Sequence, residues 1–200
     1  MMTYERVLSY GNIFPLNITC NPGNMLKEIA PFEFAQYNTK KPHIPRKGLS
    51  VTSLDGSLNG DDLESLNGST FDEMSFRIFT DVYRRSSEIR KLIDPFKEWM
   101  GRAHLLNIRK GGYFPPHRDE LSATQRSFRV IVPLQAFNPP HNYFIVEDRV
   151  TRLDEGRAYF VNTNLVHVDM SFSNDTLMLI MNIEASADAF MRLLTHVHSL

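Results

Sequence analysis

The chain has 200 residues, 42% of them hydrophobic, which is enough for one buried core and gives no reason to expect a second domain. Its 22 basic and 23 acidic residues nearly cancel and form no long run of one sign, which argues against nucleic acid or an anionic membrane as partner. With one cysteine, no signal peptide and no membrane-spanning stretch, we expect a cytoplasmic protein folded as a single domain over residues 1–200.

The first half of the chain contains one segment with a clear period. Residues 48–70 are rich in Ser, Gly, Asn and Asp, as is typical of loops. From residue 70 to 101, apolar residues recur every three or four positions among charged ones, which predicts flanking helices. We expect Pro95 to divide this helical segment and Gly101 to end it.

The second half reads as strands. Five short apolar runs cover residues 103–108, 128–137, 142–147, 157–162 and 176–184. The segments between them are rich in turn residues, which favours antiparallel hairpins and therefore a sandwich or barrel with its core over 103–184. Residues 186–198 have a helical period and predict a terminal helix.

A candidate metal site follows from two short segments of this half. His117 and Asp119 lie two residues apart after a double proline, so on extended backbone both side chains project to the same face. His167 follows the fourth run and is the third candidate ligand. Two imidazoles and one carboxylate suit iron(II) with open positions for oxygen chemistry. Zinc accepts the same ligands in a hydrolytic site, so the residue types alone leave the metal open.

The segments around these residues resemble a known family. LLNIRKGGYFPPHRD, FRVIVPL and LDEGRAYFVNTNLVHVDMSFSND look like the glycine turn with the first ligands, the arginine-bearing strand and the distal-histidine region of iron(II)- and 2-oxoglutarate-dependent oxygenases. The branch resembled is that of aspartyl/asparaginyl β-hydroxylase-like and proline hydroxylase-like enzymes. The resemblance implies a double-stranded β-helix of cupin type, mainly β with flanking helices. It also implies iron held by His117, Asp119 and His167, with 2-oxoglutarate as cosubstrate.

The resemblance also implies how the cosubstrate is held. Arg129 is the only charge in an apolar strand, and a buried guanidinium needs an anion such as a carboxylate. It corresponds to the arginine that contacts 2-oxoglutarate in this branch, with Asn107 and Tyr113 as candidate helpers. A second basic residue expected about ten positions after the distal histidine is replaced by Leu177. Three interpretations follow: Arg129 holds the cosubstrate without that residue, which is the favoured one, the cosubstrate binds in a different pose, or the site has lost oxygenase activity. The alternative for Arg129 is a structural ion pair with an acid such as Glu147 or Glu184.

The expected function is hydroxylation of an amino acid, free or within a peptide, with dioxygen as a further substrate. Residues 37–56 resemble the strand and loop beside the substrate mouth of these hydroxylases, where Arg46 or Lys47 could meet a substrate carboxylate. An exposed loop is the favoured interpretation of that segment. Two alternatives remain for the whole protein: a cupin-like metal protein that works without oxygen, and a non-catalytic module that binds an anion.

Overall fold

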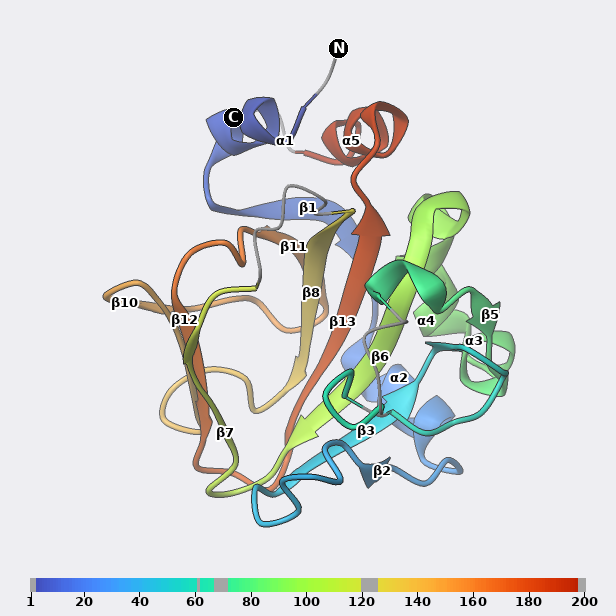
Figure 1. Ribbon diagram of the computed structural model, residues 1–200, viewed down its shortest axis with the longest axis vertical. Coiled ribbons are helices and arrows are strands. Elements are labelled where there is room, and N and C mark those ends of the chain that lie inside the picture. The colour runs from blue at the N-terminus through green and yellow to red at the C-terminus, as the bar shows by residue number, and fades with distance from the viewer. Residues whose placement is uncertain (1–2, 61, 67–71, 120–125, 198–200) are drawn as a thin grey trace.

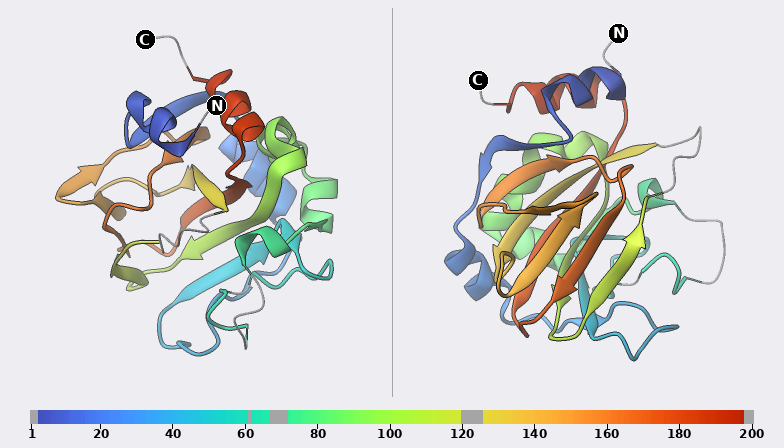
Figure 2. Two further views of the ribbon diagram at one scale, coloured as in Figure 1. Left: turned by 45° about the horizontal axis from the view of Figure 1, so that its top comes forward. Right: turned by 90° about the vertical axis from the view of Figure 1, so that its left-hand side faces the viewer.

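The computed structural model describes residues 3–60, 62–66, 72–119 and 126–197. Two antiparallel sheets face each other and enclose the barrel (Figures 1 and 2). From β6 onward the chain passes alternately between them, except that the consecutive strands β9 and β10 both lie in the smaller sheet. The barrel strands follow the order β11-β8-β13-β6 in the larger sheet and β10-β9-β12-β7 in the smaller one. This is a double-stranded β-helix, so the prediction of a mainly β, cupin-like fold with flanking helices is confirmed.

The barrel strands of the larger sheet are β6 (Met100–Ile108), β8 (Ser127–Gln135), β11 (Arg157–Val161) and β13 (Thr176–Glu184). Those of the smaller sheet are β7 (Tyr113–His117), β9 (Asn142–Val146), β10 (Arg149–Thr151) and β12 (His167–Ser171). All five apolar runs therefore contain strands. The strands β7, β10 and β12 were not expected, because they are short and carry half-exposed or polar residues in place of an apolar run.

Strands from the amino-terminal part extend the larger sheet at both edges. β1 (Ile13–Thr19) pairs with β11, while β3 (Arg46–Ser50) pairs with β6 and carries β2 (Ala35–Gln36) on its other side. β4 (Thr52–Ser53) and β5 (Ile78–Phe79) form a separate pair. Gly48 lies against Gly60, whose carbonyl oxygen would be 2.3 Å from a Cβ at residue 48. This contact, which only glycine permits, fixes the loop after β4 on β3.

Helices cover the outer face of the larger sheet (Figure 1). They are α1 (Tyr4–Val7), η1 (Leu8–Tyr10), α2 (Pro22–Ile29), α3 (Asp81–Arg85), α4 (Ser87–Ile93), η3 (Asp94–Trp99) and α5 (Ala187–Leu194). The short η2 (Glu73–Ser75) is not among them, because its Glu73 lines the pocket inside the barrel. The expected helical segment is divided at Ser86, whose extended backbone and side-chain bond to the Ile89 amide begin α4. Pro95 lies in the first turn of η3, where no N–H is needed, and Gly101 belongs to β6.

Side chains along β13 point alternately into two hydrophobic cores, one under the helices and one between the two sheets. Leu177, Leu179 and Met181 point toward the helices, whereas Met178 and Ile180 point between the two sheets. Leu177 therefore faces away from the barrel interior. Arg129 on β8 faces inward, opposite Phe128 and Val130, as the sequence pattern predicts.

Glu28 links α2 to the start of α4. Its carboxylate accepts hydrogen bonds from the Ser86 and Ser87 hydroxyls, both at 2.6 Å, and from the Glu88 amide at 3.1 Å. Burial opposes ionisation, but these hydrogen bonds outweigh it and lower the pKa of Glu28. The carboxylate therefore satisfies one of the free N–H groups that begin α4, that of Glu88, and fixes the two serine hydroxyls beside it.

Glu28→Ala is expected to lower the free energy of unfolding by about 2 kcal/mol, because three hydrogen bonds to a charged acceptor are lost. Since the folded pKa lies below the unfolded one, this contribution is present above the unfolded pKa and is lost as the pH falls through the folded pKa. Urea unfolding at pH 7 measures the effect, with the exposed neighbour Lys27→Ala as control. Equal midpoints for the two variants would contradict this role of Glu28.

Candidate metal centre

The three candidate ligands come together at one end of the barrel. β7 and β12 are antiparallel neighbours, and their register places His117 opposite His167. Asp119 follows β7 by two residues, and its amide donates a hydrogen bond to the Thr163 carbonyl at 3.0 Å. One ligand atom from each of the three residues lies within 4.8 Å of the other two. Residues fifty positions apart in the sequence thus form one cluster.

Each histidine is oriented by the backbone carbonyl two residues before it. His117 Nδ1 lies 2.7 Å from the Pro115 carbonyl oxygen, and His167 Nδ1 lies 3.0 Å from that of Leu165. A carbonyl oxygen only accepts, so in both rings Nδ1 carries the proton and Nε2 has the free lone pair. Burial lowers the pKa of His167 and outweighs the opposing effects of the Leu165 carbonyl and Asp119. His167 is therefore neutral at pH 7, the form that binds a metal.

Asp119 is held as an anion. Burial by itself raises the pKa of its carboxyl group, but Arg129, a hydrogen bond with Thr163 and the two histidines bring the pKa below its ordinary value. The Arg129 Nη1 atom lies 2.6 Å from Asp119 Oδ2, while Asp119 Oδ1 lies 3.8 Å from His117 Nε2. One carboxylate oxygen thus faces the guanidinium and the other faces the histidine cluster.

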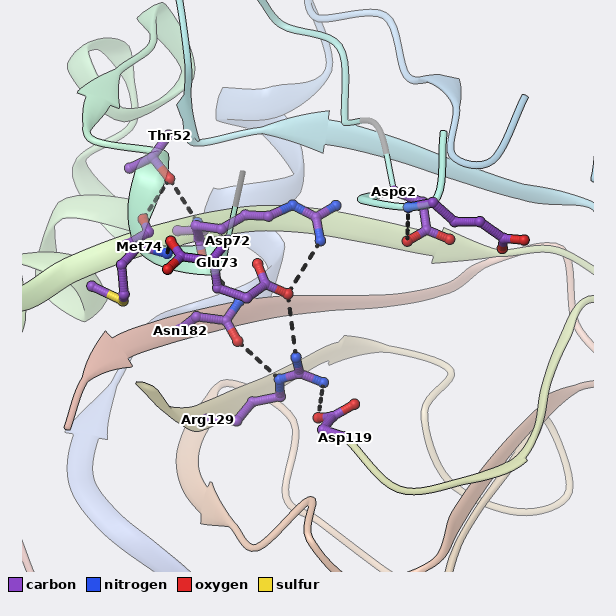
Figure 3. Close-up of polar contacts among 12 residues, drawn as sticks. Thr52, Asp62, Asp72, Glu73, Met74, Asp119, Arg129 and Asn182 are labelled. Atoms are coloured by element: carbon purple, nitrogen blue, oxygen red, sulfur yellow. Dashed lines mark hydrogen bonds and ion pairs between the residues drawn. The ribbon is translucent and has the colours of Figure 1, made fainter. Parts of the chain in front are cut away.

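Arg129 belongs to a charged network inside the barrel (Figure 3). Its Nε donates to Asn182 Oδ1 at 3.1 Å, and its Nη2 lies 3.6 Å from Glu73 Oε1. The same Glu73 oxygen lies 3.6 Å from Arg102 Nη1. The alternative prediction was a structural ion pair of Arg129 with Glu147 or Glu184. Neither acid is the partner, because Glu147 is exposed and Glu184 pairs with Arg77. Glu73, in a turn far from β8 in sequence, takes their place.

A pocket of about 620 Å³ opens beside the candidate ligands. Its wall includes Tyr113, Arg129 and all three ligands. Asn107 is not part of it: the Asn107 side chain donates to the carbonyls of Asn174 and Thr176, and its position in β6 faces away from the barrel interior. The structure therefore does not bring Asn107 to the site.

Two pocket residues, His104 and Asp169, had no role in the sequence-based expectation, and a third, Arg46, was only a candidate contact for a substrate carboxylate. Arg46, for which an exposed loop was favoured, is buried on β3 and contributes to the wall. His104 on β6 is buried, and burial, with nearby Arg102 and Arg129, places its pKa well below the ordinary value. Burial raises the pKa of Asp169 on β12 to about 7. The signal that could have found His104 is a polar residue at an inward position of an apolar strand.

Searches of the sequence against protein families and against curated proteins find no match. Solved structures with a similar fold include an oxidoreductase of the 2OG-Fe(II) oxygenase family from Burkholderia pseudomallei, at 13% identity and a TM-score of 0.47 over 82% of this chain and 78% of the other. A viral collagen prolyl hydroxylase from Paramecium bursaria Chlorella virus-1, in complex with 2OG, has 14% identity and a TM-score of 0.36, covering 53% and 72%. An RmlC-like cupin from Shewanella frigidimarina has 15% identity and a TM-score of 0.33, covering 48% and 74%.

Among the described residues, no helix is long and apolar enough to cross a membrane.

Proposed function

We propose that the protein is an iron(II)- and 2-oxoglutarate-dependent dioxygenase that hydroxylates an amino acid, free or within a peptide, in the cytoplasm. The observation that carries this proposal is the cluster of His117, Asp119 and His167 at the wall of a pocket inside a double-stranded β-helix. Two imidazoles and one carboxylate on one side of a metal leave positions for a cosubstrate and dioxygen. The pocket volume lies in the range of small-molecule sites.

The donor set fits such a metal. His117 and His167 would offer Nε2, because each Nδ1 faces a backbone carbonyl, and Asp119 would offer the oxygen that faces the histidines. When bound, iron with 2-oxoglutarate supplies the oxidation of a C–H bond by dioxygen, coupled to decarboxylation of the cosubstrate to succinate. Thr163 and Arg129 fix the direction of Asp119, and Phe144 and Ile131 form apolar wall that limits water around the reacting carbon.

Anaerobic addition of iron(II) to the purified wild-type protein, followed by 2-oxoglutarate, is the test. We expect one iron per chain and, after 2-oxoglutarate, a weak visible charge-transfer band, because the keto acid chelates the metal. Succinate, which has no keto group to chelate with, is the control and is expected to give no band. Iron binding without a response to 2-oxoglutarate would contradict the proposal.

One observation favours a second candidate, a cupin-like metal protein that isomerises or hydrolyses its substrate without oxygen. The Arg129 guanidinium already contacts Asp119, Asn182 and Glu73, and β13 carries no basic residue to anchor a second carboxylate of 2-oxoglutarate. Zinc accepts the same three ligands. Turnover that needs the metal but neither 2-oxoglutarate nor oxygen would support this candidate. A module that only binds an anion would take up no stoichiometric iron.

A further inference from the structure

Arg46 is a buried cation that forms no ion pair within the described part of the chain. Only 4% of the residue is exposed, and Nε is buried without a hydrogen-bond partner. Among residues 3–60, 62–66, 72–119 and 126–197, no carboxylate lies within ion-pair distance of its guanidinium. Burial is the main cause that lowers the pKa of Arg46. A charge is rarely buried unpaired, since water solvates it far better than the protein interior does.

The acids that face Arg46 are bound to other groups. Glu64 Oε2 lies 2.8 Å from Lys41 Nζ and accepts a hydrogen bond from Asn38 at 2.9 Å. Asp62 Oδ2 accepts from the same Asn38 amide at 2.9 Å. These contacts hold both carboxylates on the loop beside β3. Their charges still act on Arg46 across the pocket, but neither forms a contact with it.

The guanidinium is positioned by aromatic rings. Its Cζ lies 4.1 Å from the centre of the Phe114 ring and 5.4 Å from that of Tyr37. Stacking of this kind fixes the plane of an arginine and leaves its N–H edge available to a ligand. The Phe114 ring is in turn 6.2 Å from the His117 ring. Arg46 therefore lies one aromatic ring away from a candidate metal ligand, at the wall of the same pocket.

His104 adds a neutral donor to this wall. Both of its ring nitrogens are buried without a hydrogen-bond partner in the described part of the chain, and its ring stacks on Tyr37 at 5.6 Å. A neutral imidazole has one N–H to donate. The Tyr37 ring thus lies next to both the Arg46 guanidinium and the His104 imidazole.

From this arrangement we propose that Arg46 binds a carboxylate group of the molecule that occupies the pocket, with His104 as a second polar contact. This deepens the proposed function, because it names a carboxylate as the recognised group. That carboxylate belongs either to the far end of 2-oxoglutarate or to the amino-acid substrate, and a planar guanidinium suits both through two parallel N–H···O bonds.

The test compares Arg46→Met with the wild type. Methionine keeps an apolar side chain against Phe114 and Tyr37 but removes the charge. In the metal-free protein, titration calorimetry with glutarate, a dicarboxylate that needs no metal, is expected to give saturable binding that weakens at least about tenfold in the variant. Lys40→Met is the matched control, because Lys40 is exposed and does not line the pocket. Its glutarate affinity is expected to stay within about twofold of the wild type, since an exposed charge outside the pocket is screened by solvent.

Two further titrations identify the source of the carboxylate. In the iron-loaded protein without oxygen, weaker binding of 2-oxoglutarate but not of pyruvate would assign Arg46 to the far carboxylate of the cosubstrate, because pyruvate has none. A second outcome is that Arg46→Met binds both keto acids as the wild type does but is no longer stabilised against heat by free L-amino acids more than by their carboxamides. This outcome would assign Arg46 to the carboxylate of the substrate. A wild type that binds glutarate through Arg46 but shows no response to iron and 2-oxoglutarate would reject the proposed dioxygenase and retain the carboxylate site.

The melting temperatures of Arg46 variants distinguish a ligand-binding role of Arg46 from a structural one. Because an unpaired buried charge does not favour folding, Arg46→Met is expected to melt at or above the wild-type temperature. Arg46→Lys, which keeps a charge without the planar fork, is expected to lose less affinity than Arg46→Met. The proposal is overturned if the variants bind every carboxylate probe as the wild type does, if the wild type binds none of them, or if Arg46→Met melts lower with unchanged affinities.

Discussion

His167→Ala is expected to abolish stoichiometric iron(II) binding. The substitution removes one of three ligand atoms, and the remaining pair, His117 and Asp119, cannot surround one side of a metal. Loss of a group that only orients a ligand costs about 10- to 100-fold in metal affinity, so loss of a ligand itself should cost more than about 100-fold. The measurement is competition for iron(II) with a chelator of known affinity, without oxygen. The charge-transfer band with 2-oxoglutarate should disappear together with the iron.

The matched control for this substitution is His141→Ala. His141 is exposed and does not line the pocket, so its removal changes the histidine content but not the site. Circular dichroism should give the same spectrum for both variants and the wild type, because within the described residues the His167 side chain forms one hydrogen bond, to the carbonyl of Leu165. Iron affinity of His167→Ala within a few-fold of the control would remove His167 from the metal site.

Arg129→Gln is expected to weaken iron(II) binding about 10- to 100-fold, the usual effect of removing the partner of a ligating carboxylate. Arg129 contacts Asp119 at 2.6 Å and is a main cause of its lowered pKa. Without the guanidinium, burial remains and the pKa of Asp119 rises. Protons then compete with the metal at a higher pH, so the iron affinity of the variant should begin to fall at a higher pH than that of the wild type.

Arg126→Gln is the control for Arg129. Arg126 lies three residues earlier, with a side chain 70% exposed and only a 3.6 Å contact to Asp72. Its removal should leave both the iron affinity and its pH dependence unchanged. If Arg129→Gln reduced only the response to 2-oxoglutarate and not iron affinity, Arg129 would act on the cosubstrate and not on Asp119.

The metal cluster could be predicted from the sequence because it depends on local rules. Extended backbone places His117 and Asp119 on one face, and antiparallel pairing of short neighbouring strands brings His167 beside them. Arg129 was recognised as inward-facing by the same alternation. In each case the decisive signal was a polar residue at a defined position in or next to a short strand.

The partners of these residues could not be predicted in this way. Glu73 reaches Arg129 from a turn that no periodic pattern connects with β8, and Arg46 is buried only because β3 pairs with β6. Asn107 was named as a candidate helper of Arg129 in holding the cosubstrate, yet its position in β6 points it away from the pocket. The positions of all three residues depend on packing between distant parts of the chain, which a single sequence does not reveal directly.

The pocket is built from two separate parts of the chain, which the pairing of β3 with β6 brings together. The candidate ligands lie on or next to β7 and β12, whereas Tyr37 and Arg46 come from residues 35–50, which join the barrel only at the edge of the larger sheet. Substitutions in residues 35–50 can therefore change which molecule is accepted while the metal ligands stay in place. Diversification of such a pocket would proceed by exchange of this amino-terminal segment, and an engineer could graft a new ligand selectivity there onto an unaltered cluster of candidate metal ligands.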